Sequence, residues 1–243
     1  MKSDNKMSGF FLWVYNYALD IFYPKNCVVC NRMMGMGVRV CICRKCRPLL
    51  KHQFKSVRDN KYFEEAVCAL EYSGHTRDAM QDFKFRGKRY LGQTFGTVLY
   101  NKIKDRDFLN DVSLICPVPI HPLRDREYNQ SELIARYVCG FCGIPLCSDL
   151  LIKIKNLTPL STMNYVSRKS LIKSAFDFNI IYNIRGKTVC LVDDIYTTGS
   201  TVNECSRILK MYGAKKVYVI SACYADTTKE GEKENADTDI TGK

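Results

Sequence analysis

One segment near the C-terminus, KTVCLVDDIYTTGSTV at residues 187–202, restricts the fold more than any other part of the sequence. Its apolar run over residues 189–192 is typical of a buried strand in a parallel sheet. Two acids, Asp193 and Asp194, follow that run, and a hydroxyl-rich loop then opens a helix with an apolar face, predicted over residues 200–212. A strand, a loop and a helix in this order predict an α/β domain.

The loop after the two acids has the composition of a phosphate site. Backbone N–H groups at a helix N-terminus attract anions, and a glycine lets the backbone come close to a ligand. Ionised carboxylates accept hydrogen bonds from the vicinal hydroxyls of ribose, or bind a divalent ion that those hydroxyls share. The segment therefore predicts a site for a ribose 5-phosphate, made of Asp193, Asp194, Thr197, Thr198, Gly199, Ser200 and Thr201.

Two other structures are compatible with a strand that ends in paired acids. In receiver-type domains such acids bind magnesium, and no hydroxyl-rich loop need follow them. The segment can also form a purely structural turn. Four hydroxyl residues around one glycine exceed what helix capping requires, which favours the phosphate site over both alternatives.

The run VCLVDDIYTTGSTV resembles the phosphoribosyl-pyrophosphate (PRPP) binding motif of type I phosphoribosyltransferases. Four other segments resemble the ComF family of competence-associated proteins, and the matching blocks extend in order from about residue 27 to residue 225. These segments are CVVC to CRKC, EYSGHTRDAMQDFKFRGKRYLG, ICPVPIHPLRDREYNQSELIARYV and TPLSTMNYVSRKSLIKSAF. The resemblance implies a parallel-sheet phosphoribosyltransferase fold of type I, preceded by a small zinc ribbon or knuckle.

Coarse patterns along the rest of the chain agree with an α/β fold. Strands are predicted over residues 66–72, 113–118 and 217–223, and helices over residues 76–85, 91–103 and 128–142. Because strands alternate with helices, we expect a parallel sheet with both faces covered and ligands at the carboxyl ends of the strands. Four parts follow: an N-terminal amphipathic helix (1–24), a zinc-binding module with a linker (25–60), a phosphoribosyltransferase-like domain (61–225) and an acidic, disordered tail (226–243).

Four of the thirteen cysteines have the spacing of a structural metal site. Two C-x2-C pairs separated by twelve residues predict a closed tetrahedral zinc site formed by Cys27, Cys30, Cys43 and Cys46. Cys41 is left outside, since only the pair after it repeats the x2 spacing. The remaining thiols are expected to be small buried core residues, including the cluster of Cys139, Cys142 and Cys147.

The net charge of +12 favours nucleic acid, polyphosphate or an anionic membrane as a partner. The tail holds six acids against three bases, so the rest of the chain carries +15. Residues 82–90 interleave basic and aromatic side chains, a composition that can contact phosphates and stack on bases. The alternative is a helix end with buried aromatics and solvated charges. The side chains concerned are Lys84, Arg86, Lys88 and Arg89, with Phe83, Phe85 and Tyr90.

Two further loops are assigned by the resemblance. Pro119, Ile120 and His121 correspond to the pyrophosphate loop, and Arg124 and Arg126 beyond it either approach the diphosphate or form a solvated basic turn. The segment 158–176 corresponds to a lid whose bases can close over an anion. ComF-like proteins commonly have a glutamine after the Thr-Pro of this segment, so a contact to a nucleobase is not predicted here. The lid bases are Arg168, Lys169 and Lys173, and Ser161 and Thr162 stand near the glutamine position.

The N-terminus has no convincing export signal, so we expect a cytoplasmic protein with reduced thiols. Its apolar stretch over residues 10–23 falls short of the roughly 20 residues of a membrane span, so we expect a short amphipathic helix that packs on the domain, with peripheral membrane contact as the alternative. The resemblance implies a competence protein that handles single-stranded DNA, has a PRPP pocket and works with other competence or helicase-type proteins. The alternatives are an active, magnesium-dependent phosphoribosyltransferase and a PRPP-sensing regulator.

Overall fold

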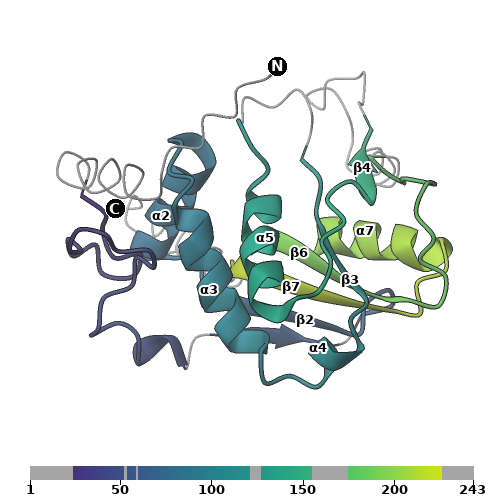
Figure 1. The fold of residues 1–243 in the computed structure, drawn as a ribbon, viewed down its shortest axis with the longest axis horizontal. Coiled ribbons are helices and arrows are strands. Elements are labelled where there is room, and N and C mark those ends of the chain that lie inside the picture. Colours follow the sequence, from purple (N-terminus) through teal and green to yellow (C-terminus); the bar gives the residue numbers. More distant parts are fainter. Residues whose placement is uncertain (1–23, 52–53, 59, 121–126, 155–174, 226–243) are drawn as a thin grey trace, which may run out of the picture.

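The computed structural model describes residues 24–51, 54–58, 60–120, 127–154 and 175–225. A five-stranded sheet forms the centre of this part of the chain, with helices on both faces and the cysteine module at one end (Figure 1). The sheet has the order β1-β2-β7-β6-β3, in which β1 is antiparallel to its neighbour and the other four strands are parallel. These strands are β1 (Lys55–Val57), β2 (Glu65–Glu71), β3 (Leu114–Pro117), β6 (Thr188–Tyr196) and β7 (Lys216–Tyr224).

Five α-helices, a 3-10 turn and a small ribbon complete the described structure. The ribbon is antiparallel and pairs β4 (Leu151–Lys153) with β5 (Phe176–Phe178) outside the main sheet. The helices are η1 (Leu49–Lys51, 3-10), α2 (Gly74–Phe85), α3 (Leu91–Ile103), α4 (Phe108–Asp111), α5 (Gln130–Cys142) and α7 (Ser200–Met211).

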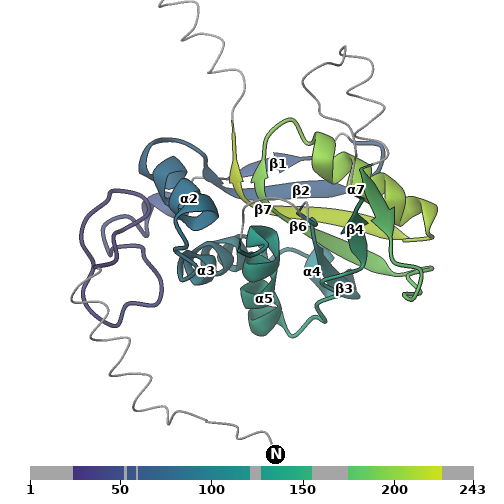
Figure 2. The ribbon, with the colours of Figure 1, turned by 90° about the horizontal axis from the view of Figure 1, so that it is seen from above.

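The two faces of the sheet carry separate apolar clusters. Helices α2, α3 and α5 cover one face, while α7 and the ribbon cover the other (Figure 2). Alternate residues of β6 divide between the two, with Cys190 and Val192 in the first cluster and Val189 and Leu191 in the second. Because β6 is buried on both sides, its sequence is a continuous apolar run rather than an alternating one.

The cysteine module packs directly on α3. The backbone N–H of Cys41 donates a 2.9 Å hydrogen bond to Oγ1 of Thr94, and both residues are fully buried. Val28 and Ile42 of the module belong to the same apolar cluster as the sheet. The module is therefore part of the main core rather than an appended finger.

Helices α3 and α5 meet at a glycine. A Cβ atom placed on Gly96 would lie 2.6 Å from Cβ of Tyr137 and 3.1 Å from the carbonyl oxygen of Ile134, so the two helices could not keep their present separation. We expect Gly96→Ala to lower the free energy of unfolding by about 1–3 kcal/mol, the usual cost of overpacking a core. Urea denaturation measures the change.

Gly140 on α5 provides the matched control for that experiment. It also lies within a helix, but nothing stands within 4 Å of a Cβ atom added there. Gly140→Ala should therefore raise the stability slightly, through the roughly 0.5–1 kcal/mol by which alanine exceeds glycine in a helix. An equal response of the two variants would contradict the close contact at Gly96.

The predicted elements are confirmed within a few residues, with three corrections. The sheet is mixed rather than entirely parallel, because β1 runs antiparallel at its edge. The strand of the first motif continues through both acids to Tyr196 instead of ending before them. Cys139, Cys142 and Cys147 are half-buried rather than core residues, whereas the thiols of Cys68, Cys116, Cys190, Cys205 and Cys223 are fully buried as predicted.

Among the described residues, no helix combines the length and apolarity that a membrane crossing requires. The predicted N-terminal helix and the acidic tail lie outside the described residues.

Candidate functional site

The two acids lie at the carboxyl end of β6, between its parallel neighbours β7 and β3. Asp193 stands opposite Ser221 of β7 and is 9% exposed. Its Oδ1 accepts hydrogen bonds from Oγ of Ser131 at 3.3 Å and from the backbone N–H of Asp194 at 2.9 Å. Ser131 lies in the first turn of α5, so that helix helps to fix the acid pair.

The environment of Asp193 favours its protonated form. Burial is the main cause, and the negative charge of Asp194 adds to it, so the pKa of Asp193 rises to about 7. The backbone amide of Asp194, the ammonium of Lys84 and the hydroxyl of Ser131 act in the opposite direction but do not offset the burial. Strongly raised carboxyl pKa values are typical of ligand sites.

Lys84 closes the acid pair from the side of α2. Its Nζ lies 2.8 Å from Oδ2 of Asp194, and the two side chains are only 12% and 13% exposed. Two residues, one just before α5 and one at its start, hold the C-terminal end of α2 in place by hydrogen bonds. The Tyr128 hydroxyl donates to the carbonyl of Phe83, and Nε2 of Gln130 donates to the carbonyl of Lys84 at 3.4 Å. The ion pair is therefore placed by two helices and one strand.

The loop after β6 has the backbone and hydroxyl arrangement that is expected of a phosphate cradle. Gly199 caps α7 in the left-handed region at φ +75°, and Tyr196 lies directly beneath it. The hydroxyls of Thr198 and Ser200 are hydrogen-bonded to each other at 2.8 Å. Thr197 and Thr201 are exposed on either side. Donors of this kind around the N-terminus of a twelve-residue helix form a site that attracts anions.

Asp193 and the loop share one shallow hollow of about 20 Å³, whose lining includes Asp193, Tyr196, Thr197, Gly199, Ser200 and Thr201. That space holds about one water molecule or one phosphate oxygen. A sugar phosphate would therefore sit on the surface of the loop, with one oxygen entering the hollow.

The predicted pyrophosphate loop starts beside the acids. Pro117 of β3 stands opposite Val192 of β6, and the backbone N–H of Val118 donates to the carbonyl of Val192 at 2.8 Å. Pro119 and Ile120 therefore leave the sheet next to Asp193. The other predicted anion contacts, namely His121, Arg124, Arg126, Arg168, Lys169 and Lys173, and the positions Ser161 and Thr162, lie outside the described residues.

The basic stretch near the end of α2 is largely paired within the molecule. Arg86 and Lys88 both bind Asp82, at 2.8 Å and 2.7 Å, and the Arg89 guanidinium lies 4.8 Å from the ring centre of Tyr128. Phe83 is fully buried, as the alternative of buried aromatics expects, so its ring is not available to stack on a base. Phe85, by contrast, is 66% exposed.

The four predicted zinc ligands come together. The sulfur atoms of Cys27, Cys30, Cys43 and Cys46 all lie within 4.8 Å of one another. Sγ of Cys30 and Sγ of Cys43 are 3.7 Å apart, which matches the separation of about 3.8 Å that 2.3 Å bonds to a tetrahedral zinc impose. Cys41 is buried nearby but is not a member of this group.

Thiol acidity within the cluster is uneven. The backbone amide of Cys46 lowers the pKa of Cys43 to about 6, whereas burial raises the pKa of Cys46. The backbone N–H of Cys43 also donates to Sγ of Cys27 at 3.4 Å. Backbone donors aimed at sulfur stabilise thiolates, the form that binds metal. The residues therefore fit a structural zinc ion.

Sequence reasoning missed the residues that support the acids. Asn129 caps α5 by accepting hydrogen bonds from the N–H groups of Ser131 and Glu132, and its side-chain amide donates to the carbonyl of Val118 at 3.0 Å. The asparagine just before the helix is a capping signal that could have marked this position. No local pattern could have paired Lys84 with Asp194.

The raised pKa of Asp193 predicts how stability depends on pH. The folded chain holds the Asp193 proton up to about pH 7, whereas an ordinary aspartate loses it near 3.8, so rising pH destabilises the fold between these values. Asp193→Asn removes this penalty. We expect the variant and the wild type to be similarly stable at pH 4, and the variant to be more stable by a few kcal/mol at pH 8.

Urea midpoints at pH 4, 6 and 8 measure that difference. Asp105→Asn is the control, because Asp105 is an exposed acid. A stability difference between Asp193→Asn and wild type that stays constant or shrinks with pH would exclude the raised pKa.

Known proteins are similar to this chain in sequence. Residues 133–242 match the model of the phosphoribosyl transferase domain. "Competence protein F" of Haemophilus influenzae is 30% identical over 175 residues, which cover 70% of this chain and 76% of that protein. "DNA utilization protein YhgH" of Salmonella typhimurium is 23% identical over 220 residues, or 87% of this chain and 95% of that one.

A solved structure is similar in part. It is the glutamine PRPP amidotransferase from B. subtilis complexed with ADP and GMP, which is 18% identical with a TM-score of 0.44. The match covers 59% of this chain but only 30% of the amidotransferase. The family is thus assigned from the sequence relatives, from the matching domain model and from the order of the motifs. This chain belongs to the ComF family of competence proteins, whose members carry a phosphoribosyltransferase-type fold.

Proposed function

We propose that this chain handles single-stranded DNA in natural transformation and that its β6–α7 site takes the ribose 5-phosphate part of PRPP. The observation that carries the proposal is the relationship to proteins named for competence and for DNA utilization. A net charge of +12 supports it, because DNA binding draws on basic side chains that replace counterions around the phosphates.

The ligand part of the proposal follows from the geometry around β6. The 5-phosphate would rest on the N-terminus of α7, and the ribose hydroxyls would donate to Asp193 and Asp194. Magnesium, when bound with PRPP, would neutralise part of the pyrophosphate charge. Lys84 already pairs with Oδ2 of Asp194 at 2.8 Å, so a diol that takes this oxygen would displace it. The released ammonium would then be free for the pyrophosphate or for a DNA phosphate.

The remaining parts of the proposal concern the metal, the surroundings and the partners. Cys27, Cys30, Cys43 and Cys46 would hold a structural zinc ion that fixes the module against α3. The surroundings would be a reducing cytoplasm, in which thiols such as these stay reduced. Other competence or helicase-type proteins would be partners, and segment 1–24 would give peripheral membrane contact.

A titration of the zinc-loaded chain with a labelled single-stranded oligonucleotide tests the DNA part. Three to five phosphate contacts would give a slope of roughly −2 to −3.5 for the logarithm of affinity against the logarithm of salt. A duplex of the same length is the control and should bind more weakly. Absence of salt-dependent binding by the pure protein would refute single-strand handling.

A second candidate function is phosphoribosyl transfer. It is favoured by the intact acid pair and loop, which would hold the ribose and stabilise positive charge at its reacting carbon. Incubation with magnesium, PRPP and a panel of bases and amines should then release pyrophosphate. Release no greater than that of the double variant Asp193→Ala and Asp194→Ala would eliminate this candidate, while a PRPP-sensing regulator would survive.

Calorimetry tests whether the binding of PRPP is coupled to the binding of single-stranded DNA. PRPP with magnesium is titrated into the chain with and without single-stranded DNA. If the Lys84 displacement links the two ligands, each should change the affinity of the other by the same factor. Lys84→Met should abolish that coupling while leaving DNA binding in place, because most basic residues remain.

A further inference from the structure

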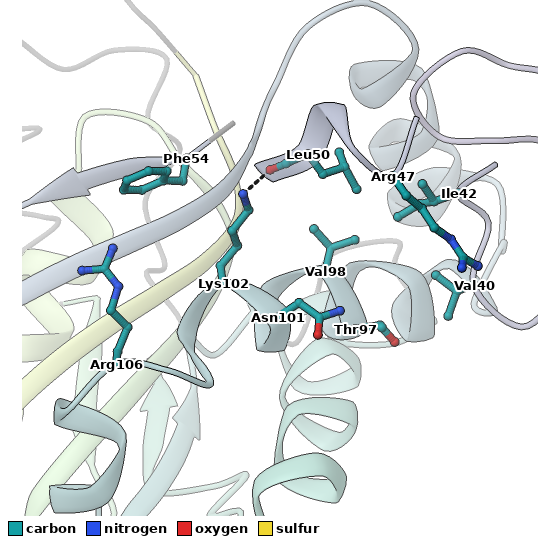
Figure 3. Close-up of a pocket in the computed structure, with 10 residues that line it drawn as sticks. All are labelled: Val40, Ile42, Arg47, Leu50, Phe54, Thr97, Val98, Asn101, Lys102 and Arg106. Carbon is teal, nitrogen blue, oxygen red and sulfur yellow. Dashed lines mark hydrogen bonds between the residues drawn. The ribbon is translucent and has the colours of Figure 1, made fainter. Parts of the chain in front are cut away.

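A second cavity lies between the cysteine module and α3, away from the β6–α7 site (Figure 3). Its volume is about 580 Å³, within the usual range of small-molecule sites. None of the predicted site residues lines it. The cavity therefore needs a separate explanation.

The middle of the cavity is apolar. Ile42 of the module, Leu50 of η1 and Val98 of α3 face it, and all three are at most 8% exposed. They come from three separate elements that pack in one cluster. The surface under a ligand would therefore be rigid, which lowers the cost of binding.

The rim of the cavity is positively charged. Arg47, Lys102 and Arg106 line it, and none of the described residues that line it is acidic. Arg106 lies 3.3 Å from Glu65, but the same carboxylate oxygen also lies 3.4 Å from Arg58, so one acid serves two arginines and positive charge remains.

Lys102 has a hydrogen bond but no acidic partner among the residues that line the cavity. Its ammonium donates to the backbone carbonyl of Leu50, and burial lowers its pKa. A neutral carbonyl does not balance its charge. A bound anion would do so.

An aromatic ring and an amide complete the lining. Phe54 is 47% exposed, and its ring centre lies 5.8 Å from Nζ of Lys102 and 5.7 Å from the guanidinium carbon of Arg106. Figure 3 places Phe54 and Arg106 at one end, Arg47 with Ile42 and Val40 at the other, and Leu50 and Val98 between them. Asn101 adds donor and acceptor groups beside Val98. The arrangement is an apolar surface between two basic ends, with an aromatic ring at one of them.

We propose that this cavity binds a nucleotide unit of single-stranded DNA, with its base against Phe54 and Val98 and its flanking phosphates on Arg47 and Arg106. Basic groups at both ends favour a unit within a strand, because only there does a phosphate stand on each side of a base. Base stacking on an aromatic ring is tolerant of sequence, as a general single-strand binder requires. This inference rests on the proposed function.

The test compares three ligands by fluorescence anisotropy and competition. They are an oligothymidylate, an abasic oligonucleotide of equal length and the free nucleotide dTMP. Wild type should bind the oligothymidylate roughly tenfold more tightly than the abasic strand, since stacking contributes about 1–3 kcal/mol per base. Phe54→Ala should reduce this preference several-fold and leave the abasic affinity unchanged. Arg47→Ala should weaken both strands alike.

Controls keep the result specific to the cavity. Phe141→Ala removes a ring of similar exposure, 45%, that does not line the cavity, and Arg185→Ala removes an exposed arginine elsewhere. Both should behave as wild type. Binding of dTMP that Phe54→Ala abolishes, without strand binding, would support a free nucleotide as the occupant and refute the strand.

Two further results would overturn the proposal. If wild type binds the oligothymidylate and Phe54→Ala keeps the full preference over the abasic strand, the cavity does not hold a base, although DNA handling stands. If wild type binds neither strand nor dTMP, both the cavity proposal and the DNA part of the proposed function fail. Circular dichroism of each variant excludes loss of fold as the cause.

Discussion

Replacing Cys27 with serine is expected to remove the metal and destabilise the whole chain. Its sulfur belongs to the four-thiol group, and its side chain is 1% exposed in the same apolar cluster as α3 and the sheet. Structural zinc contributes roughly 10–16 kcal/mol to the folding of zinc-finger peptides at pH 7. A loss of half of that, roughly 5–8 kcal/mol, would equal the whole stability of many domains.

Metal analysis and thermal unfolding measure the two effects. Wild type should contain about one zinc ion per chain, and Cys27→Ser close to none. Cys142→Ser is the matched control, because Cys142 is a half-buried thiol outside the four-thiol group. Cys41→Ser should also keep the metal, though its buried position will cost some stability. Full zinc content in Cys27→Ser would show that the cluster is not the metal site.

Gly199→Ala is expected to disrupt the phosphate loop. The added Cβ would lie 2.4 Å from the hydroxyl oxygen of Tyr196 and 2.8 Å from the ring carbon that bears it. Tyr196 is only 8% exposed, so its ring cannot move away cheaply. The left-handed backbone at φ +75° adds about 1–2 kcal/mol for any L side chain. Stability should fall by about 2–4 kcal/mol, and PRPP affinity by a hundredfold or more, because the loop that faces the phosphate must move.

Gly143 isolates the effect of the clash. Its φ is +73°, but no atom stands within 4 Å of an added Cβ, so Gly143→Ala incurs the backbone cost alone. That variant should lose about 1–2 kcal/mol and retain PRPP binding. Calorimetry with magnesium and PRPP gives the affinities. Unchanged PRPP affinity in Gly199→Ala would refute the phosphate cradle, and no PRPP binding by wild type would refute the ligand itself.

The long elements were predictable because their signals are local. Helices over Leu91–Ile103 and Ser200–Met211 have apolar faces, and β6 has a run of buried residues. The acids were placed after the strand because charge usually ends an apolar run. The strand β6 continues through the acids because its backbone stays paired with β7 there, with Asp193 opposite Ser221 at the centre of the sheet. Strands as short as β4 and β5, with three residues each, leave no periodicity to detect.

The cysteine cluster and the hydroxyl-rich loop were predictable for a related reason. Each of these motifs, the C-x2-C pair and the glycine among hydroxyl residues, spans only a few residues. A short spacing fixes the relative positions of the side chains within the motif. The pair of Lys84 and Asp194 joins residues far apart in the sequence, as does the contact of Ser131 with Asp193. Such contacts depend on how helices pack on the sheet. The basic cavity beside α3 is hidden from the sequence in the same way.

The buried hydrogen bond between Cys41 and Thr94 has a consequence for synthesis. The ribosome releases the cysteine module before α3 exists, so the module cannot reach its final packing until residues 91–103 have emerged. Until then the thiols of the module remain accessible to oxidants, and its apolar side chains remain accessible to other chains. A metal ion that binds at this stage would protect the thiols from oxidation and hold the module folded, which would keep its apolar side chains away from other chains. We therefore expect the supply of zinc during translation, rather than after it, to set the yield of native protein, as pulse-labelling in zinc-limited cells would reveal.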